Sequence, residues 1–248
     1  MIDKTEQKSQ HQGKSRLINT PFGDMSPKVD LFPIIYLLIV YGVVFFLPFY
    51  VYKDYTLYDF WGRGEGLISE QLQFLLYFSS SILSFLIVWR QRRVINRKQI
   101  IAWILFGLFC LFIALEEISL LDYLNGGFES IKQINAQNET NLHNLNLIQP
   151  YVHTSFIFSG LFFGWFGWRY WPNIQALPKR RYSLYFLFVS AFYGYSDINS
   201  YTKMISCVFE NCPFREEVFE FLMALGLFLH CYNMAFNYVS GRKITARP

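Results

Sequence analysis

Six apolar stretches of about 20 residues each constrain this 248-residue chain more than any other feature. Together they hold 131 residues but only eight of the 40 charged side chains. A helix rises 1.5 Å per residue, so about 20 residues cross the roughly 30 Å hydrocarbon core of a bilayer. The sequence therefore predicts an all-α polytopic membrane bundle with six transmembrane helices. The expected spans are residues 31–52, 67–89, 100–121, 151–171, 182–201 and 216–238.

The basic residues are sorted between the two sides of this expected bundle. Sixteen of the 22 Lys and Arg residues fall in residues 1–30, 90–99, 172–181 and 239–248, and five fall in the alternate loops. The positive-inside rule therefore predicts that both termini are cytoplasmic, and the polar tail 1–30 is expected to be disordered. The net charge of +4 indicates contact with anionic lipid headgroups of the bilayer. Because no Arg-rich patch alternates with aromatic residues, a nucleic-acid partner is not expected.

The acidic residues are sorted too, because all fourteen beyond residue 30 fall in the expected outer loops or the outer ends of spans. The positive-inside rule does not require this, since Asp and Glu contribute little to it. Ionisable groups within spans are functional candidates by default, although solvated groups at a span edge are an equal alternative. These candidates come from four spans: Glu70 from 67–89, Glu116 and Glu117 from 100–121, Asp197 from 182–201, and Glu216, Glu217 and Glu220 from 216–238.

Residue spacing predicts which helix faces point into the bundle. In span 67–89, Glu70 begins a polar stripe at steps of three and four residues, which continues through Gln73, Tyr77, Ser80 and Ser84. We expect that stripe to face the other helices.

Two further faces are predicted in the same way. Asp197 lies on a polar face of span 182–201 that also carries Ser190 and Gly194. Span 151–171 has a small-residue face at Gly160, Gly164 and Gly167, which indicates close helix packing. His153 lies seven residues before Gly160 and therefore on the same face, where it is either a ligand or a hydrogen-bonded imidazole.

The longest expected outer loop, residues 122–150, is rich in amides and carries Glu139 and His143 four residues apart. In a short helix this spacing lets a carboxylate and an imidazole share one metal ion or one hydrogen bond. Cys207 and Cys212 lie in the last outer loop, where an oxidising environment favours a local disulfide over a metal pair.

Glu116-Glu-Ile-Ser119 ends the third span, and Asn135-x-Gln-x-Glu-x-Asn-Leu-His-Asn144 follows in the loop. In these two segments the chain resembles a family of uncharacterised bacterial integral membrane proteins that share this signature. The resemblance covers roughly residues 110–146. It implies a multi-pass protein of the bacterial inner membrane and supplies no activity or catalytic residue.

Three functions are compatible with this pattern. The first is a divalent metal site for hydrolysis or transfer on a lipid or envelope substrate. The second is proton- or cation-coupled transport, and the third is a non-catalytic sensor or assembly protein. For the first, the candidate metal ligands are Glu139, His143, Glu117 and Glu220; the candidate catalytic residues are Glu70, Glu117 and Asp197; and the supporting residues are Asn135, Gln137, Asn144, Glu116 and His153.

Overall fold

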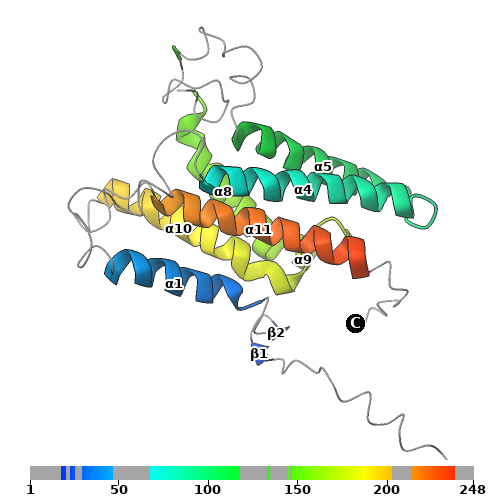
Figure 1. Cartoon of the computed structure of the whole chain (residues 1–248), viewed down its shortest axis with the longest axis horizontal. Coiled ribbons are helices and arrows are strands. Elements are labelled where there is room, and N and C mark those ends of the chain that lie inside the picture. Colours follow the sequence, from blue (N-terminus) through cyan, green and yellow to red (C-terminus); the bar gives the residue numbers. More distant parts are fainter. Residues whose placement is uncertain are drawn as a thin grey trace, which may run out of the picture.

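A computed structural model of the chain describes residues 18–20, 23–25, 30–46, 68–117, 133–134, 145, 147–202 and 214–237. Within these residues the helices coincide with the expected apolar stretches (Figure 1). They are α1 (Phe32–Phe46), α4 (Ile68–Gln91), α5 (Arg97–Glu117), α8 (Gln149–Leu161), α9 (Gly167–Tyr170), α10 (Ser183–Thr202) and α11 (Phe214–Asn237). A π-helical turn, η2 (Phe162–Phe166), joins α8 to α9, and a 3-10 turn, η3 (Arg180–Tyr182), precedes α10.

Three of the helices in the described part of the chain are long and apolar enough to cross a membrane. They are Ser69–Gln91 in α4, Arg97–Glu117 in α5 and Glu217–Phe236 in α11. The prediction of a helical membrane protein rests on these three, judged by length and composition. Helix α1 has 15 residues, and the π-helical turn divides the helical run from Gln149 to Tyr170.

A short hairpin lies in the segment that the sequence predicted to be a disordered tail. Strand β1 (Ile18–Thr20) pairs antiparallel with β2 (Gly23–Met25), with Ile18 opposite Met25. Shortly after it, the buried carboxylate of Asp30 forms an ion pair with Arg181 of η3, at 3.3 Å from Oδ1 to Nε. This pair fixes the start of α1 next to the connection between α9 and α10.

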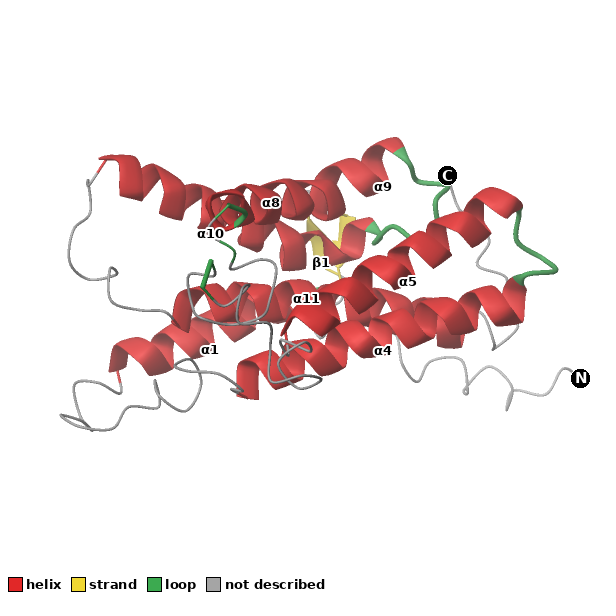
Figure 2. Ribbon diagram, turned by 90° about the horizontal axis from the view of Figure 1, so that it is seen from above, coloured by secondary structure: helices red, strands yellow, loops and turns green. Residues whose placement is uncertain are grey.

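The long helices lie side by side, and each runs opposite to the one before it in the chain, as Figures 1 and 2 show. Helix α4 packs against α5 and α11, and α10 packs against α8 and α11. The polar stripe of α4 faces this interior, as predicted: Gln73, Tyr77, Ser80 and Ser84 are at most 1% exposed. The hydroxyl groups of Ser80 and Ser84 donate to the carbonyl oxygens of Leu76 and Ser80, so the helix itself satisfies them.

Glycines allow α8 and α10 to approach closely. A Cβ atom on Gly160 would lie 2.6 Å from the carbonyl oxygen of Phe186, and one on Gly164 would lie 2.9 Å from Leu187 Cγ. The Ser190 hydroxyl donates across the same contact to the carbonyl oxygen of Ile157, at 2.6 Å. The small-residue face predicted from the sequence is therefore a helix-packing surface.

The two ends of the bundle differ in charge. We call the end where α4 and α11 begin and α5 and α10 finish the acidic end, since it carries Glu70, Glu117, Asp197 and Glu220. The opposite end holds the α4–α5 turn and η3, with a run of basic residues in each, and we call it the basic end.

Aromatic packing fills the bundle near the basic end. The ring of His230 on α11 stacks on Trp103 of α5 with centroids 5.7 Å apart, and Phe106 and Tyr182 meet it edge-on. His230 is fully buried, and its Nε2 lies 3.1 Å from the carbonyl oxygen of Gln175. Because a carbonyl only accepts, Nε2 carries the proton of the neutral imidazole.

Candidate functional site

Carboxylates from three helices converge at the acidic end. Glu117, the last residue of α5, interacts electrostatically with Glu70 of α4, with its neighbour Glu116, and with Glu217 and Glu220 of α11. We call these five residues the carboxylate cluster. Carboxylates that interact with one another repel when ionised, so the cluster favours bound protons, a bound cation or basic side chains among its neighbours. Glu70, Glu117 and Glu220 thus interact at one end of the bundle, and their role as one catalytic or metal site stays a prediction.

His153 and Asp197 form a second polar group beside this cluster. His153 Nδ1 lies 2.7 Å from Asp197 Oδ1, and the side chains are 36% and 34% exposed. The pair joins α8 to α10, because both helices place these residues on the face that contains the close glycine packing. When Nδ1 donates its proton to Asp197, Nε2 keeps the lone pair of the neutral ring. The pair is thus arranged as an oriented base.

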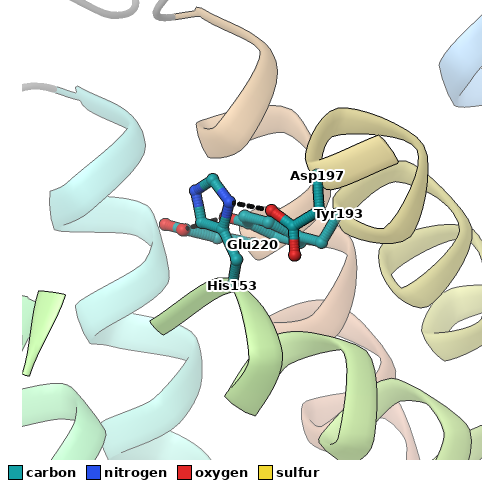
Figure 3. A network of polar contacts seen from close by, with 4 residues as sticks. All are labelled: His153, Tyr193, Asp197 and Glu220. Carbon is teal, nitrogen blue, oxygen red and sulfur yellow. Dashed lines mark hydrogen bonds and ion pairs between the residues drawn. The ribbon is translucent and has the colours of Figure 1, made fainter. Parts of the chain in front are cut away.

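Tyr193 joins the two groups. Its hydroxyl donates to Glu220 Oε1 at 2.5 Å, and its ring centroid lies 5.0 Å from that of His153. Phe156 stacks on Tyr193 at 4.7 Å with an angle of 6°, which fixes the tyrosine ring. Figure 3 shows the imidazole of His153 between Asp197 on one side and the Glu220 carboxylate on the other. Three helices therefore contribute to one continuous polar network.

Gln73 joins α4 to the same region. Its Nε2 donates to Glu217 Oε2 at 2.6 Å, and the Gln73 side chain is fully buried. One turn further along α4, the buried Tyr77 interacts electrostatically with Glu117 and Glu220. Gln73 and Tyr77 of the polar stripe on α4 therefore both interact with residues of the carboxylate cluster.

Several of the predicted site residues lie outside the described residues. These are the proposed metal pair Glu139 and His143, the amides Asn135, Gln137 and Asn144, and the disulfide candidates Cys207 and Cys212. Among the residues that the structure does describe, no group of three or more His, Cys, Asp or Glu side chains is arranged to hold a metal ion. The metal site predicted at Glu117 and Glu220 therefore stays a prediction.

Sequence reasoning assigned three neighbouring residues too small a role. His153, expected only as a supporting residue, is hydrogen bonded to Asp197 at the centre of the network. Tyr193 was not singled out, although it precedes Asp197 by four residues and therefore shares its helix face. Glu217 was noted for its charge alone, and its contact with Gln73 comes from the packing of α4 against α11.

The basic end has its own polar contacts, which stand apart from this network. Gln99 accepts at Oε1 from the backbone N–H of Gln175, at 2.8 Å, and donates to the carbonyl oxygen of Asn173. Lys179 lies nearby, and its pKa is lowered by partial desolvation and by the charge of Arg181.

The chain matches no protein-family model, no curated protein and no solved structure. The fold and the polar network of the acidic end define it as a helical protein with three helices long and apolar enough to cross a membrane and with interacting carboxylates at one end of its bundle.

Proposed function

We propose that this protein is a metal-dependent hydrolase or transferase of the bacterial inner membrane, acting at the outer face on a lipid or envelope substrate. In this proposal six spans cross the membrane, both termini are cytoplasmic and the acidic end faces outward. The family resemblance and the charge asymmetry of the loops support that placement. The carboxylate cluster supplies oxygen ligands for a divalent cation.

One observation carries the proposal: the oriented His153–Asp197 pair lies next to the carboxylate cluster and is partly exposed. Asp197 holds the imidazole in one orientation and stabilises the imidazolium that forms when His153 takes a proton. A cation in the cluster would polarise the substrate and lower the pKa of a bound water. His153 thus supplies the general base, and Glu70, one of the catalytic candidates from the sequence, becomes a neighbour of the cation.

The proposal is tested with the full-length protein in liposomes of total bacterial lipid, with and without Mn²⁺, using mass spectrometry to detect products. We expect a metal-dependent product that His153→Gln and Asp197→Asn both reduce by about 10²- to 10⁴-fold. Ser155→Ala is the matched control, because Ser155 lies on α8, is exposed and donates to the carbonyl oxygen of Tyr151. Absence of any product from the unmodified protein contradicts the proposal, as does full activity in both variants.

A second function, cation-coupled transport, is favoured by the buried polar stripe of α4. From Gln73 and Tyr77 the stripe continues toward the basic end through Ser80 and Ser84. The Oγ atom of Ser84 lies 3.6 Å from Cys231 Sγ on α11. A voltage- and cation-dependent current in planar bilayers, abolished by Glu117→Gln, would support transport over hydrolysis. If the protein gives no current in planar bilayers and still forms the lipid product, transport is excluded and the hydrolase or transferase function is favoured.

A further inference from the structure

Gln73 has one amide atom paired and one unpaired, in a fully buried position. Nε2 donates to Glu217 at 2.6 Å, whereas Oε1 is a buried acceptor without a hydrogen-bond partner among the described residues. A buried carbonyl oxygen left without a hydrogen-bond donor destabilises the folded state. The two atoms are bonded to the same carbon, so Oε1 is close to the Nε2 atom that donates to Glu217.

The ionisable groups at this end of α4 are mainly acidic. Glu117 interacts electrostatically with Glu217 and Glu220, and Tyr77, one turn from Gln73, interacts with Glu117 and Glu220. Tyr193 already donates its hydroxyl proton to Glu220. Carboxylate and amide oxygens are the ligands that hard cations prefer, whereas thiolate and imidazole suit softer metals. The surroundings of Gln73 therefore fit a hard cation better than zinc or copper.

We propose that Gln73 Oε1 is a ligand of a hard divalent cation, of the Mg²⁺, Mn²⁺ or Ca²⁺ type, which lies between α4, α5 and α11 and is shared with Glu117 and Glu217. Mg²⁺ in particular is usually bound by only one or two carboxylates and retains several waters. Three acidic ligands are therefore not required. The inference rests on the proposed function, since it identifies the class of ion at the same end of the bundle, and it adds a ligand that acidic residues alone do not reveal.

The experiment measures Mn²⁺ affinity by electron paramagnetic resonance of the full-length protein in detergent. Gln73→Met keeps the volume of the side chain and removes the oxygen, and we expect it to weaken Mn²⁺ binding by about 10- to 100-fold. Gln91→Met is the matched control: Gln91 also lies on α4, is buried and has an unpaired Oε1, but it is about 27 Å away by helical rise. We expect Gln91→Met to bind Mn²⁺ like the unmodified protein.

Electron spin-echo spectroscopy of the bound Mn²⁺ adds a readout that a general loss of folding would not move. We expect no coupling to nitrogen, because every proposed ligand atom is oxygen. Strong nitrogen coupling would place the ion on an imidazole and overturn the inference, as would unchanged affinity in Gln73→Met or no Mn²⁺ binding by the unmodified protein. The proposed function is decided separately, by whether the unmodified protein forms a lipid product. If it does, and Gln73→Met still binds Mn²⁺ with unchanged affinity, the inference about Gln73 is wrong and the proposed function stands.

Discussion

Tyr193 on α10 donates a hydrogen bond of 2.5 Å to Glu220 on α11, and this contact connects the partly exposed His153–Asp197 pair to the carboxylate cluster. The tyrosine ring lies between Phe156, on which it stacks, and the imidazole of His153. Its hydroxyl is therefore held in place by aromatic contacts with α8. Through Tyr193, the position of Glu220 depends on the packing of three helices.

Tyr193→Phe should keep the stacking and remove only this donor. Hydrogen bonds to charged groups contribute about 1.5–3 kcal/mol, so we expect a loss of that size in the free energy of unfolding, measured by denaturant titration in detergent micelles. Tyr195→Phe, on the same helix at a side chain that is 44% exposed, is the control and should change little. Equal stability of the two variants would show that Glu220 does not depend on the hydroxyl.

The His153–Asp197 pair should contribute little to stability in spite of its short distance. Both side chains are more than a third exposed, and exposed ion pairs typically contribute less than about 1 kcal/mol because water screens them. A double-mutant cycle with His153→Gln and Asp197→Asn should therefore give a coupling energy below about 1 kcal/mol in unfolding experiments. A much larger coupling would assign the pair a structural role and weaken its proposed role in catalysis.

Gly160 should be among the glycines least tolerant of a larger side chain. A Cβ there would meet backbone and Ser190 atoms of α10, so Gly160→Ala should force α8 and α10 apart and cost about 1–3 kcal/mol of unfolding free energy. Gly194→Ala is the matched control on α10, because nothing lies within 4 Å of its added Cβ. It should be neutral or stabilise the helix by up to about 1 kcal/mol. Thermal unfolding of the two variants tests the contrast.

The lowered pKa of Lys179 should rise when the charge of Arg181 is removed. Desolvation is the larger cause of the lowering and the charge of Arg181 the smaller, so Arg181→Gln should move the pKa part of the way back toward 10.5. Arg180→Gln is the control, because its guanidinium lies over Trp168 at 5.4 Å and is not a cause of the shift. NMR of ¹³C-methylated lysines measures both variants.

The same shift has a consequence for stability. Between the lowered folded pKa and 10.5, the unfolded chain keeps a proton on Lys179 that the folded chain has lost. The contribution of Lys179 to stability therefore increases as pH rises through that interval. In Arg181→Gln the interval between the two pKa values becomes narrower. We therefore expect the free energy of unfolding to increase less with pH, as measured by unfolding experiments at alkaline pH.

The helices could be predicted well from the sequence because apolar length and polar spacing are local properties. The spacing of Gln73, Tyr77, Ser80 and Ser84 correctly predicted the inward face of α4, and the glycine spacing correctly predicted a close packing surface on α8. Three helices of the described residues are long and apolar enough to cross a membrane, and the six spans and the orientation stay predictions.

The site could be predicted only in part, because its contacts join distant segments. The similar depth of the carboxylates in the spans predicted that they lie at one end of the bundle, where Glu117 interacts with Glu70 and Glu220. The pairing of His153 with Asp197 depends instead on the relative rotation of α8 and α10. The contact between Gln73 and Glu217 joins residues 144 positions apart, and no local pattern contains it. The expected metal pair Glu139 and His143 lies outside the described residues and stays a prediction.

The π-helical turn from Phe162 to Phe166 has a consequence for how this chain tolerates deletions. The N–H of Gly167 reaches back five residues to the carbonyl oxygen of Phe162, so the turn holds one residue more than a regular α-helix would need. A chain shortened by one residue here could close the turn as ordinary α-helix. Because the π-turn takes up the extra residue, the segment bearing His153 would keep its orientation relative to the segment bearing Trp168. The same deletion in the regular part of α8 after His153 would instead rotate His153 by about 100° and separate it from Asp197.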